Sequence, residues 1–387
     1  MTRNAAIAAA AAEIAEWRRD FHRHPELLYD VQRTAGLVEQ RLRAFGCDEV
    51  VPGIGRTGVV GLVHGRGGRG KTIGLRADMD ALPILEETGA AHQSTVPGRM
   101  HACGHDGHTA MLLGAARHLC ETRDFTGTAA LIFQPAEEGG GGGKAMVDDG
   151  LMTRFGIGEV FGMHNLPGLA AGHFALRPGA IMASADRFDI VVHGKGAHAA
   201  QPHEGIDPVV TGAQIVTALQ TIVARALDPL KACVVSVTRF EAGSAYNVIP
   251  QSARLAGTVR SLDADVRDFA RKRVTAIAQD IAAAFGARAE VAYHMGYPVT
   301  RNHAAQTAFA AEIAARVAGA ENVDAEVQPI MGAEDFSYML EARPGAFIFI
   351  GNGAGPGLHH PAYDFNDAII PAGVEYWTRL AETRLAG

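Results

Sequence analysis

The sequence of 387 residues has few aromatic residues, no excess of positive charge and no long apolar run. Aromatic residues make up 6% of the chain and the formal net charge is −7, so the basic surface of a nucleic-acid-binding protein is not expected. No run of about 18 apolar residues is found, and a membrane-spanning helix is not expected either. Hydrophobic residues at 48% and charged residues at 20% exclude a largely disordered chain or a coiled coil.

Cysteine is also scarce. The chain has four, at Cys47, Cys103, Cys120 and Cys233. No spacing motif pairs them, and an export signal is not expected, so we interpret them as reduced thiols in a cytoplasmic protein. The Ala-rich stretch 5–12 is interrupted by Glu13 and Glu16, which favours an amphipathic first helix over a signal peptide.

Glycine, by contrast, is abundant, and one Gly-rich segment matches a nucleotide-binding motif. Gly65–Thr72 fits the pattern G-x-x-x-x-G-K-[ST], whose phosphate-binding mechanism requires that a helix follow the loop. The residues after Thr72 predict a strand instead. We therefore interpret this segment as a Gly-rich hairpin turn between two strands and reject nucleotide binding.

The order of predicted elements indicates an α/β fold with two domains. An opening helix to Phe45 is followed by alternating strands and helices, as in a sheet covered by helices. Between residues 184 and 295 the order becomes β-α-β-β-α-β, which is typical of a ferredoxin-like α+β unit. We therefore expect a catalytic α/β domain from residues 1–183 and 296–387, with an inserted domain at 184–295.

The densest cluster of reactive side chains precedes a predicted helix that begins at His108. Cys103 and His105 are separated by one glycine, so a sharp turn can direct both side chains at one point. A thiolate and an imidazole are good ligands for zinc-like ions. Taken alone, this pair could equally be a buried cysteine and a capping histidine.

A second cluster favours a metal site. Glu137 and Glu138 follow a buried strand, His164 ends another, and His359 lies in a Gly/Pro-rich loop. Ligands of open α/β sheets gather at the carboxyl ends of strands, and two buried carboxylates require a nearby cation. One cysteine, three histidines and one glutamate can hold two metal ions, and the other glutamate can serve as a general base.

Together these motifs resemble the aminoacylase/carboxypeptidase metallopeptidases, in the branch of hippurate hydrolases, N-acyl-amino-acid amidohydrolases and auxin-conjugate hydrolases. The resemblance runs nearly end to end. The segments that carry it are Phe21–Leu27, Met79–Pro83, Cys103 with His105, Gln134–Glu138, Gly196–Ala200, Asn247–Pro250, Gly257–Arg260, Gly332–Phe336 and Tyr363–Asp367.

The resemblance implies a role for each matching position near the metals. Cys103 would bridge two divalent ions, with Glu138 and His359 completing one site and the pair His105 and His164 completing the other. Zinc or manganese would fill these sites, and cobalt or nickel would also fit such ligands.

Two further carboxylates have roles by the same resemblance. Glu137 would act as the general base toward the attacking water. Asp80 would orient a metal-binding histidine, for which His105 is the candidate.

For the inserted domain the resemblance implies a lid that also forms a dimer. His198 and Asn247 would bind the substrate, often across the interface of a homodimer, and Arg260 would bind a substrate carboxylate in a bidentate manner. The chain crossings near Ala183 and Tyr297 would act as hinges.

One position departs from the family pattern. His359 is followed by His360 and Pro361, whereas the family has Asn or Ser before the proline, so His360 competes with His359 as a ligand.

The expected activity is hydrolysis of the amide bond of N-acyl amino acids such as benzoyl, acetyl or indole-acyl conjugates. Two alternatives stay open: a dipeptidase or carboxypeptidase, and a catalytically idle ligand-binding protein on the same scaffold.

Overall fold

A computed structural model describes residues 3–386, which divide into two compact units. The first unit contains the chain up to Ile181, residues 301–328 and the chain from Asp335 onward; the second contains residues 182–300 and 329–334. The second unit thus extends beyond the predicted 184–295 at both ends. The segment 329–334, predicted in the catalytic domain, belongs to the second unit, where Ala183 N donates to Gly332 O at 2.8 Å and Met182 pairs with Ile330.

The first unit is built on an eight-stranded sheet of order β1-β2-β4-β3-β5-β16-β6-β15. Its strands are β1 (Glu49–Ile54), β2 (Gly58–His64), β3 (Thr72–Asp78), β4 (Thr128–Gln134), β5 (Ile157–Pro167), β6 (Phe174–Ala175), β15 (Val323–Asp324) and β16 (Gly345–Gly353). The central strands β4, β3, β5 and β16 run parallel. Nearly all of their residues are buried. The continuous apolar runs in the sequence predicted this burial, which is typical of strands covered on both faces.

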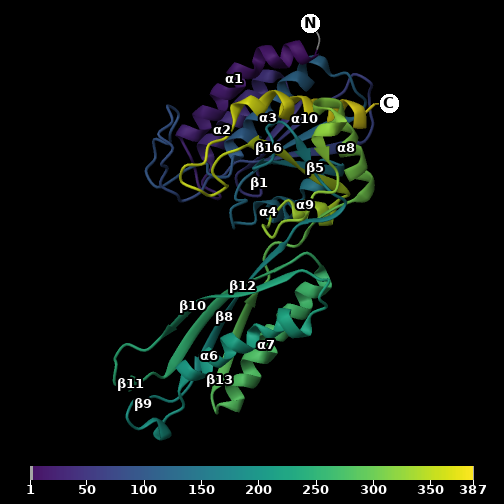
Figure 1. Ribbon diagram of the computed structural model, residues 1–387. Coiled ribbons are helices and arrows are strands. Elements are labelled where there is room, and N and C mark those ends of the chain that lie inside the picture. The colour runs from purple at the N-terminus through teal and green to yellow at the C-terminus, as the bar shows by residue number, and fades with distance from the viewer. Residues whose placement is uncertain (1–2, 387) are drawn as a thin grey trace. The chain divides into compact units, whose positions relative to one another are not determined.

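Helices pack on this sheet (Figure 1). Those of the first unit are α1 (Arg3–Arg23), α2 (Gln32–Phe45), α3 (His105–Thr122), α4 (Gly142–Asp148), α5 (Leu151–Arg154), α8 (Ala304–Ala318), α9 (Ser337–Ala342) and α10 (Ile370–Arg384). Residues of α1, α2, α3, α8 and α10 share one apolar core with alternate residues of the strands. The prediction of one opening helix to Phe45 was wrong, because Pro25 cannot continue a helix and α2 begins only at Gln32.

The predicted hairpin between β2 and β3 was also wrong. The two strands do not pair, because β4 lies between them, antiparallel to β2 and parallel to β3. The Gly-rich loop between them instead contacts the chain before β4, with Gly65 N donating to Gly127 O at 2.9 Å. It leads into a strand as predicted, so no helix N-terminus is available there for a phosphate.

The second unit contains a four-stranded antiparallel sheet of order β10-β12-β8-β13. Its elements are β8 (Ser184–His193), α6 (Pro208–Leu219), β10 (Cys233–Ala242), β12 (Ser252–Ser261), α7 (Ala264–Ala284) and β13 (Arg288–His294). This is the predicted β-α-β-β-α-β order, and α6 and α7 share the core of one sheet face. A small pair, β9 (Ala197–His198) with β11 (Val248–Ile249), completes the unit, while β7 (Gly179–Met182) and β14 (Thr300–Asn302) span the chain crossings.

One helical stretch needs separate mention. Pro208–Ala226, which is α6 and the turns that follow it, is long and apolar enough to span a membrane by length and composition alone. The sequence predicted no membrane-spanning helix, and core helices share this length and composition. Ile215, Leu219 and Ile222 pack into the core of the second unit, whereas Val210 and Val223 are exposed.

Candidate metal centre

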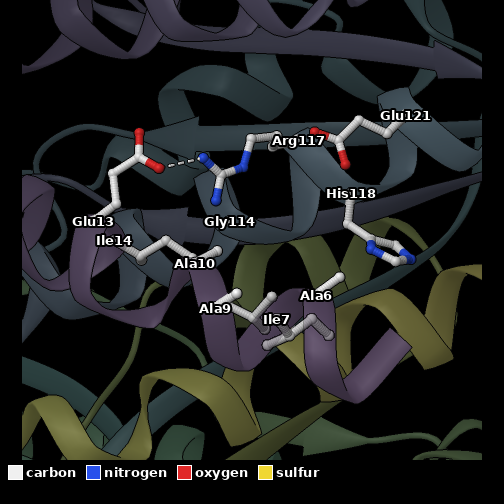
Figure 2. A pocket seen from close by; sticks show the side chains of 11 residues that line it. Ala6, Ile7, Ala9, Ala10, Glu13, Ile14, Gly114, Arg117, His118 and Glu121 are labelled. Atoms are coloured by element: carbon white, nitrogen blue, oxygen red, sulfur yellow. Dashed lines mark hydrogen bonds and ion pairs between the residues drawn. The ribbon is translucent and has the colours of Figure 1, made fainter. Parts of the chain in front are cut away.

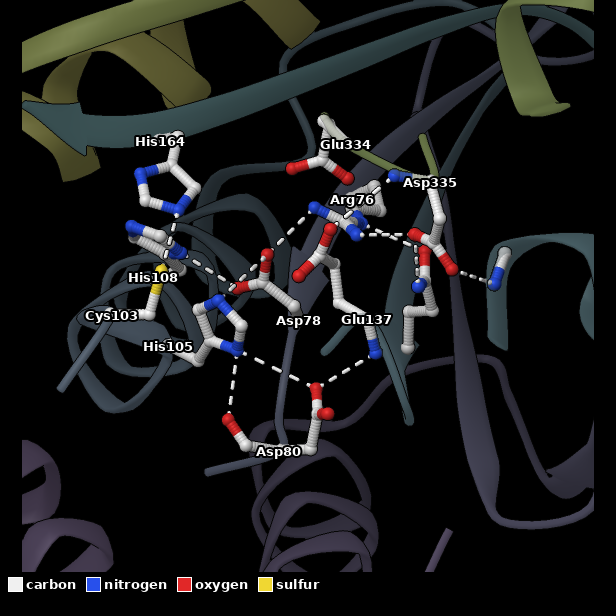
Figure 3. A network of polar contacts seen from close by, with 12 residues as sticks. Arg76, Asp78, Asp80, Cys103, His105, His108, Glu137, His164, Glu334 and Asp335 are labelled. Carbon is white, nitrogen blue, oxygen red and sulfur yellow. Dashed lines mark hydrogen bonds and ion pairs between the residues drawn. The ribbon is translucent and has the colours of Figure 1, made fainter. Parts of the chain in front are cut away.

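Side chains able to bind a metal gather beyond the carboxyl ends of the parallel strands of the first unit (Figure 3). Glu137 and Glu138 follow β4, and His164 lies on β5 two residues past its last pairing with β3. Cys103 and His105 stand at the start of α3. The fold therefore brings together residues from three segments that lie more than 25 positions apart in the sequence.

The five predicted ligands form two groups that share one sulfur. Cys103, His105 and His164 make one group, and Cys103, Glu138 and His359 make the other, with the ligand atoms of each group within 4.8 Å of one another. Cys103 Sγ lies 3.3 Å from His164 Nε2, and His359 Nε2 lies 3.4 Å from Glu138 Oε1. The grouping is the one that the family resemblance implied.

The two buried histidines are held with the same nitrogen pointing to the centre. His164 Nδ1 donates to the carbonyl of Asn165 at 2.7 Å, and His105 Nδ1 donates to the carbonyl of Asp80 at 2.8 Å. Because a carbonyl oxygen only accepts, both Nδ1 atoms carry a proton, and Nε2 is the nitrogen of each ring that is left to bind a metal. This is the usual arrangement of histidine as a metal ligand.

The buried groups of this centre fit a cation. His105 Nε2 is buried and forms no hydrogen bond within residues 3–386, and its nearest carboxylate oxygens, Asp78 Oδ2 and Glu138 Oε1, lie 3.7 and 3.9 Å away. Burial lowers the pKa of His105, but the carboxylates of Asp78, Asp80 and Glu138 outweigh it and raise this pKa to about 10. Burial, with the same glutamate nearby, raises the pKa of the Cys103 thiol well above its ordinary value. A divalent ion would supply the positive charge that these groups require.

A glycine sets the geometry between the first two ligands. Gly104 has φ +92°, and a Cβ built there would lie 2.2 Å from Asn165 Oδ1 and 2.6 Å from the Tyr363 hydroxyl. Any other residue would both strain the backbone and displace these side chains. Only glycine therefore allows Cys103 and His105 to face one point.

Asp80 has a wider role than the sequence analysis expected. Its carboxylate accepts hydrogen bonds from the backbone nitrogens of Glu137 at 2.9 Å and Glu138 at 3.1 Å. It is the backbone carbonyl of Asp80, and not mainly the carboxylate at 3.5 Å, that orients His105. One residue thus positions a histidine ligand and both glutamates.

The predicted base, Glu137, is buried beside the ligands. Its carboxylate lies within 4.8 Å of the ligand atoms of His105 and Glu138. Glu137 Oε1 also accepts a hydrogen bond from Asp335 N at 3.3 Å. This position suits a group that exchanges a proton with water at the metal centre.

Sequence reasoning missed a buried ionic network behind the ligands. Arg76 donates to Asp78 at 2.7 Å and to Asp335 at 3.1 Å, and Asp335 also accepts from Gly143 N at 2.7 Å. Asp78 further contacts His108 Nδ1 at 2.6 Å. The sequence did contain a signal for this network, because Arg76 and Asp78 lie in the otherwise apolar strand β3. Charged side chains are buried in such a strand only when they are paired.

The predicted substrate-binding residues all lie in the second unit. His198 pairs with Val248 in the β9–β11 pair, and Asn247 O accepts a hydrogen bond from Ala199 N at 3.0 Å. Arg260 lies eight residues along β12 from Ser252, about 26 Å from the end of the strand that leads to this pair. The second unit thus keeps Arg260 apart from His198 and Asn247.

Hollows also lie outside the metal centre. Arg260 lines one of about 500 Å³ on the open face of the second sheet. Figure 2 shows another, of about 300 Å³, between α1 and α3, with Ile7, Gly114 and His118 in its lining. It lies about 13 Å along α3 from His105, so it is not part of the metal centre.

Comparison with known proteins identifies the family. A hippurate hydrolase of Campylobacter jejuni is 41% identical over 369 residues, which cover 95% of this chain and 96% of the relative. An N-acetyl-L-cysteine deacetylase of Bacillus subtilis is 42% identical over 354 residues, 91% of this chain and 83% of the relative.

A solved structure agrees. The YxeP protein of Bacillus subtilis, described as a dinuclear metal binding peptidase from the M20 family, has a TM-score of 0.85 and 36% identity, covering 98% of this chain and 99% of its own. The resemblance inferred from the motifs is confirmed. The sequence model of the family described as "Peptidase family M20/M25/M40" also matches residues 74–383, so the chain belongs to this family.

Proposed function

We propose that the protein is a metal-dependent amidohydrolase that cleaves N-acyl amino acids to a carboxylic acid and a free amino acid. The observation that carries this proposal is the pair of three-residue groups that share Cys103 in the first unit. The names of the two relatives, which hydrolyse hippurate and deacetylate N-acetyl-L-cysteine, support the substrate class.

Each residue of the centre has a task in this reaction. Cys103, with the pairs His105/His164 and Glu138/His359, would hold two divalent ions, zinc or manganese, which lower the pKa of water and polarise the amide carbonyl when bound. Glu137 accepts the proton of the attacking water and returns it to the leaving amine. Asp80 holds the glutamates in place through their backbone nitrogens.

The proposal is tested by metal analysis together with hydrolysis assays. Plasma mass spectrometry on purified protein should find two ions per chain and identify the metal. A panel of N-benzoyl, N-acetyl and indole-acyl amino acids, with dipeptides beside them, should show release that a chelator abolishes and added metal restores. Faster cleavage of the dipeptides would favour a peptidase. Absence of metal and of hydrolysis, without rescue by zinc or manganese, would leave the ligand-binding alternative.

We also infer a homodimer formed through the second unit. The exposed large apolar side chains of this unit are Val209, Val210, Val223, Leu230, Val234, Phe240, Tyr246, Val248, Phe285 and Met295. β10 is moreover an edge strand of its sheet. Exposed apolar groups and an open edge favour association. If Arg260 and His198 bind the same small substrate, their separation in one chain requires that they come from two copies.

Two finer assignments belong to the same proposal. A cytoplasmic location agrees with four cysteines that are all free thiols.

If Arg260 binds the substrate carboxylate, Arg260→Ala should weaken hydrolysis of free N-acyl amino acids far more than that of their amides. Equal losses of kcat/KM on both would contradict the clamp. The lid role of the second unit stays a prediction.

A further inference from the structure

Two of the four cysteines, 73 positions apart, meet at one edge of the first unit. Cys47 directly follows the glycine that ends α2, and Cys120 lies in the last turn of α3. Their sulfur atoms are 3.5 Å apart. Neither belongs to a group of metal-binding side chains in residues 3–386. The contact lies about 22 Å along α3 from His105, so it has no part in the proposed hydrolysis.

The backbone around these thiols is held independently of the sulfurs. Arg123, three residues after Cys120, donates to Gly46 O at 2.7 Å and to Asp48 Oδ2 at 2.6 Å. These acceptors are the two neighbours of Cys47 in the sequence. Cys47 N itself donates to Leu42 O at 3.1 Å. The two thiols are therefore kept adjacent by bonds that would persist if the sulfurs reacted.

The surroundings also favour a thiolate. The hydrogen bond from Cys47, together with the charge of Arg123, lowers the pKa of Cys120 despite its burial. Cys47 is half-buried at the surface, so a small oxidant can reach the pair. By contrast, burial alone raises the pKa of Cys233 to about 11. Reactive cysteines are typically those with a cationic neighbour and a resolving thiol at hand.

The distance is suitable for a covalent bond. A disulfide requires the sulfurs to be about 2.05 Å apart, which is about 1.5 Å closer than they are in this structure. Rotation of the two Cα–Cβ bonds moves a sulfur by more than this. The helices themselves need not move far, since Arg123 already ties their ends together.

We propose that Cys47 and Cys120 are a redox-active dithiol, a modification site at which a hydroperoxide forms a reversible disulfide between α2 and α3. The thiolate of one cysteine attacks the peroxide oxygen, the O–O bond breaks, and a sulfenic acid and one water or alcohol form. The thiol of the other cysteine then attacks this sulfur and releases water. In sum, two thiols and one hydroperoxide give one disulfide, one water and one water or alcohol. A dithiol reductant reverses the reaction by exchange.

The test uses the full, metal-loaded protein with hydrogen peroxide as the probe. We expect the intact mass to fall by about 2 Da, as two hydrogens are lost, and the thiol titre of the denatured protein to fall from four to two. Proteolytic mapping should find one cross-linked peptide pair containing residues 47 and 120. Dithiothreitol should restore the mass and all four thiols.

Serine variants make the assignment specific. Cys47→Ser and Cys120→Ser should each lose the 2 Da shift, while Cys233→Ser, the matched control, should keep it. The wild-type protein alone is also decisive. A titre that stays at four, a cross-link through Cys103 or Cys233, or addition of two or three oxygens to Cys120 in place of a disulfide would each overturn the proposal.

Discussion

At the scale of single residues, several buried carboxylates of the first unit lie around the candidate metal centre. Asp78, Asp80 and Asp335 are fully buried, and each accepts hydrogen bonds from a backbone nitrogen or from Arg76. Buried carboxylates are tolerated only with such partners. The two adjacent glutamates differ in their neighbours. Glu138 belongs to a group of metal-binding side chains that contains Cys103, and Glu137 does not.

This separation predicts different effects for two isosteric changes. Glu137→Gln should keep both metal ions but lower kcat by a factor on the order of 10² to 10⁴, the usual contribution of a positioned base. Glu138→Gln is the matched control and should lose metal, because it removes a ligand charge. Metal analysis and kcat are measured on the same preparations. A near-normal kcat in Glu137→Gln would remove that residue from the role of base.

A second prediction at this scale concerns stability and pH. His22 is fully buried, and although burial lowers its pKa, hydrogen bonds to Asp106 and Glu86 raise this pKa from 6.5 to about 9. A raised pKa stabilises the fold below pH 6.5, and that contribution is lost as the pH rises through 9. It amounts to about 3 kcal/mol in the free energy of unfolding.

The measurement is urea unfolding followed by tryptophan fluorescence, since Trp17 and Trp377 both lie in the first unit. Between pH 6 and 9.5 the wild type should lose stability more steeply than His22→Gln. His24→Gln, altered at a half-exposed neighbour, should follow the wild type. Parallel curves for wild type and His22→Gln would mean that His22 does not carry the linkage.

At the scale of elements, the centre is positioned by places where helices begin and strands end. α3 begins at His105 directly after Gly104, whose φ of +92° turns the chain. β3 and β4 end at Asp78 and Gln134, so the residues that follow converge at one edge of the sheet.

Gly104→Ala tests this dependence on local backbone. The added methyl would meet Asn165 Oδ1 at 2.2 Å in a backbone region unfavourable for alanine, so we expect lost metal and a lower melting temperature. Gly36→Ala is the control: it lies inside α2 with nothing within 4 Å of the new Cβ, and it should be neutral or stabilising by up to about 1 kcal/mol. Wild-type metal content in Gly104→Ala would contradict the account.

At the scale of the whole molecule, the two units differ in what they expose. Most of the exposed large apolar side chains lie in the second unit, where Val209 and Val210 of α6 and Val223 of the helical turn that follows it are exposed. Exposed apolar residues on one helix favour a partner.

The expected outcome is a dimer that one charge disrupts. Wild-type protein should elute in light-scattering chromatography at twice its 40.7 kDa, and Val210→Glu should shift toward the monomer, because it places a charge in an apolar contact. Leu85→Glu, at an exposed position of the first unit, should leave the dimer intact. A wild-type monomer at micromolar concentration would refute the interface.

The sequence by itself determined the family, the α/β class and the order of elements in the second unit. It also named the five candidate ligands. Hydrophobic periodicity and the residues that start or stop helices depend on only a few neighbouring positions, and a ligand motif such as Cys103-Gly104-His105 spans three. These patterns can therefore be recognised in the sequence without knowledge of the fold. Even the wrong opening helix has a local reason, since Pro25 is visible in the sequence.

Only the tertiary structure decided which distant segments meet. It placed β4 between β2 and β3 and residues 329–334 in the second unit. It also showed that the Asp80 carboxylate accepts hydrogen bonds from the backbone of the two glutamates, and that Cys47 contacts Cys120. Each of these contacts joins residues far apart along the chain. Such pairings depend on how whole elements pack, and no local pattern of residue types encodes them.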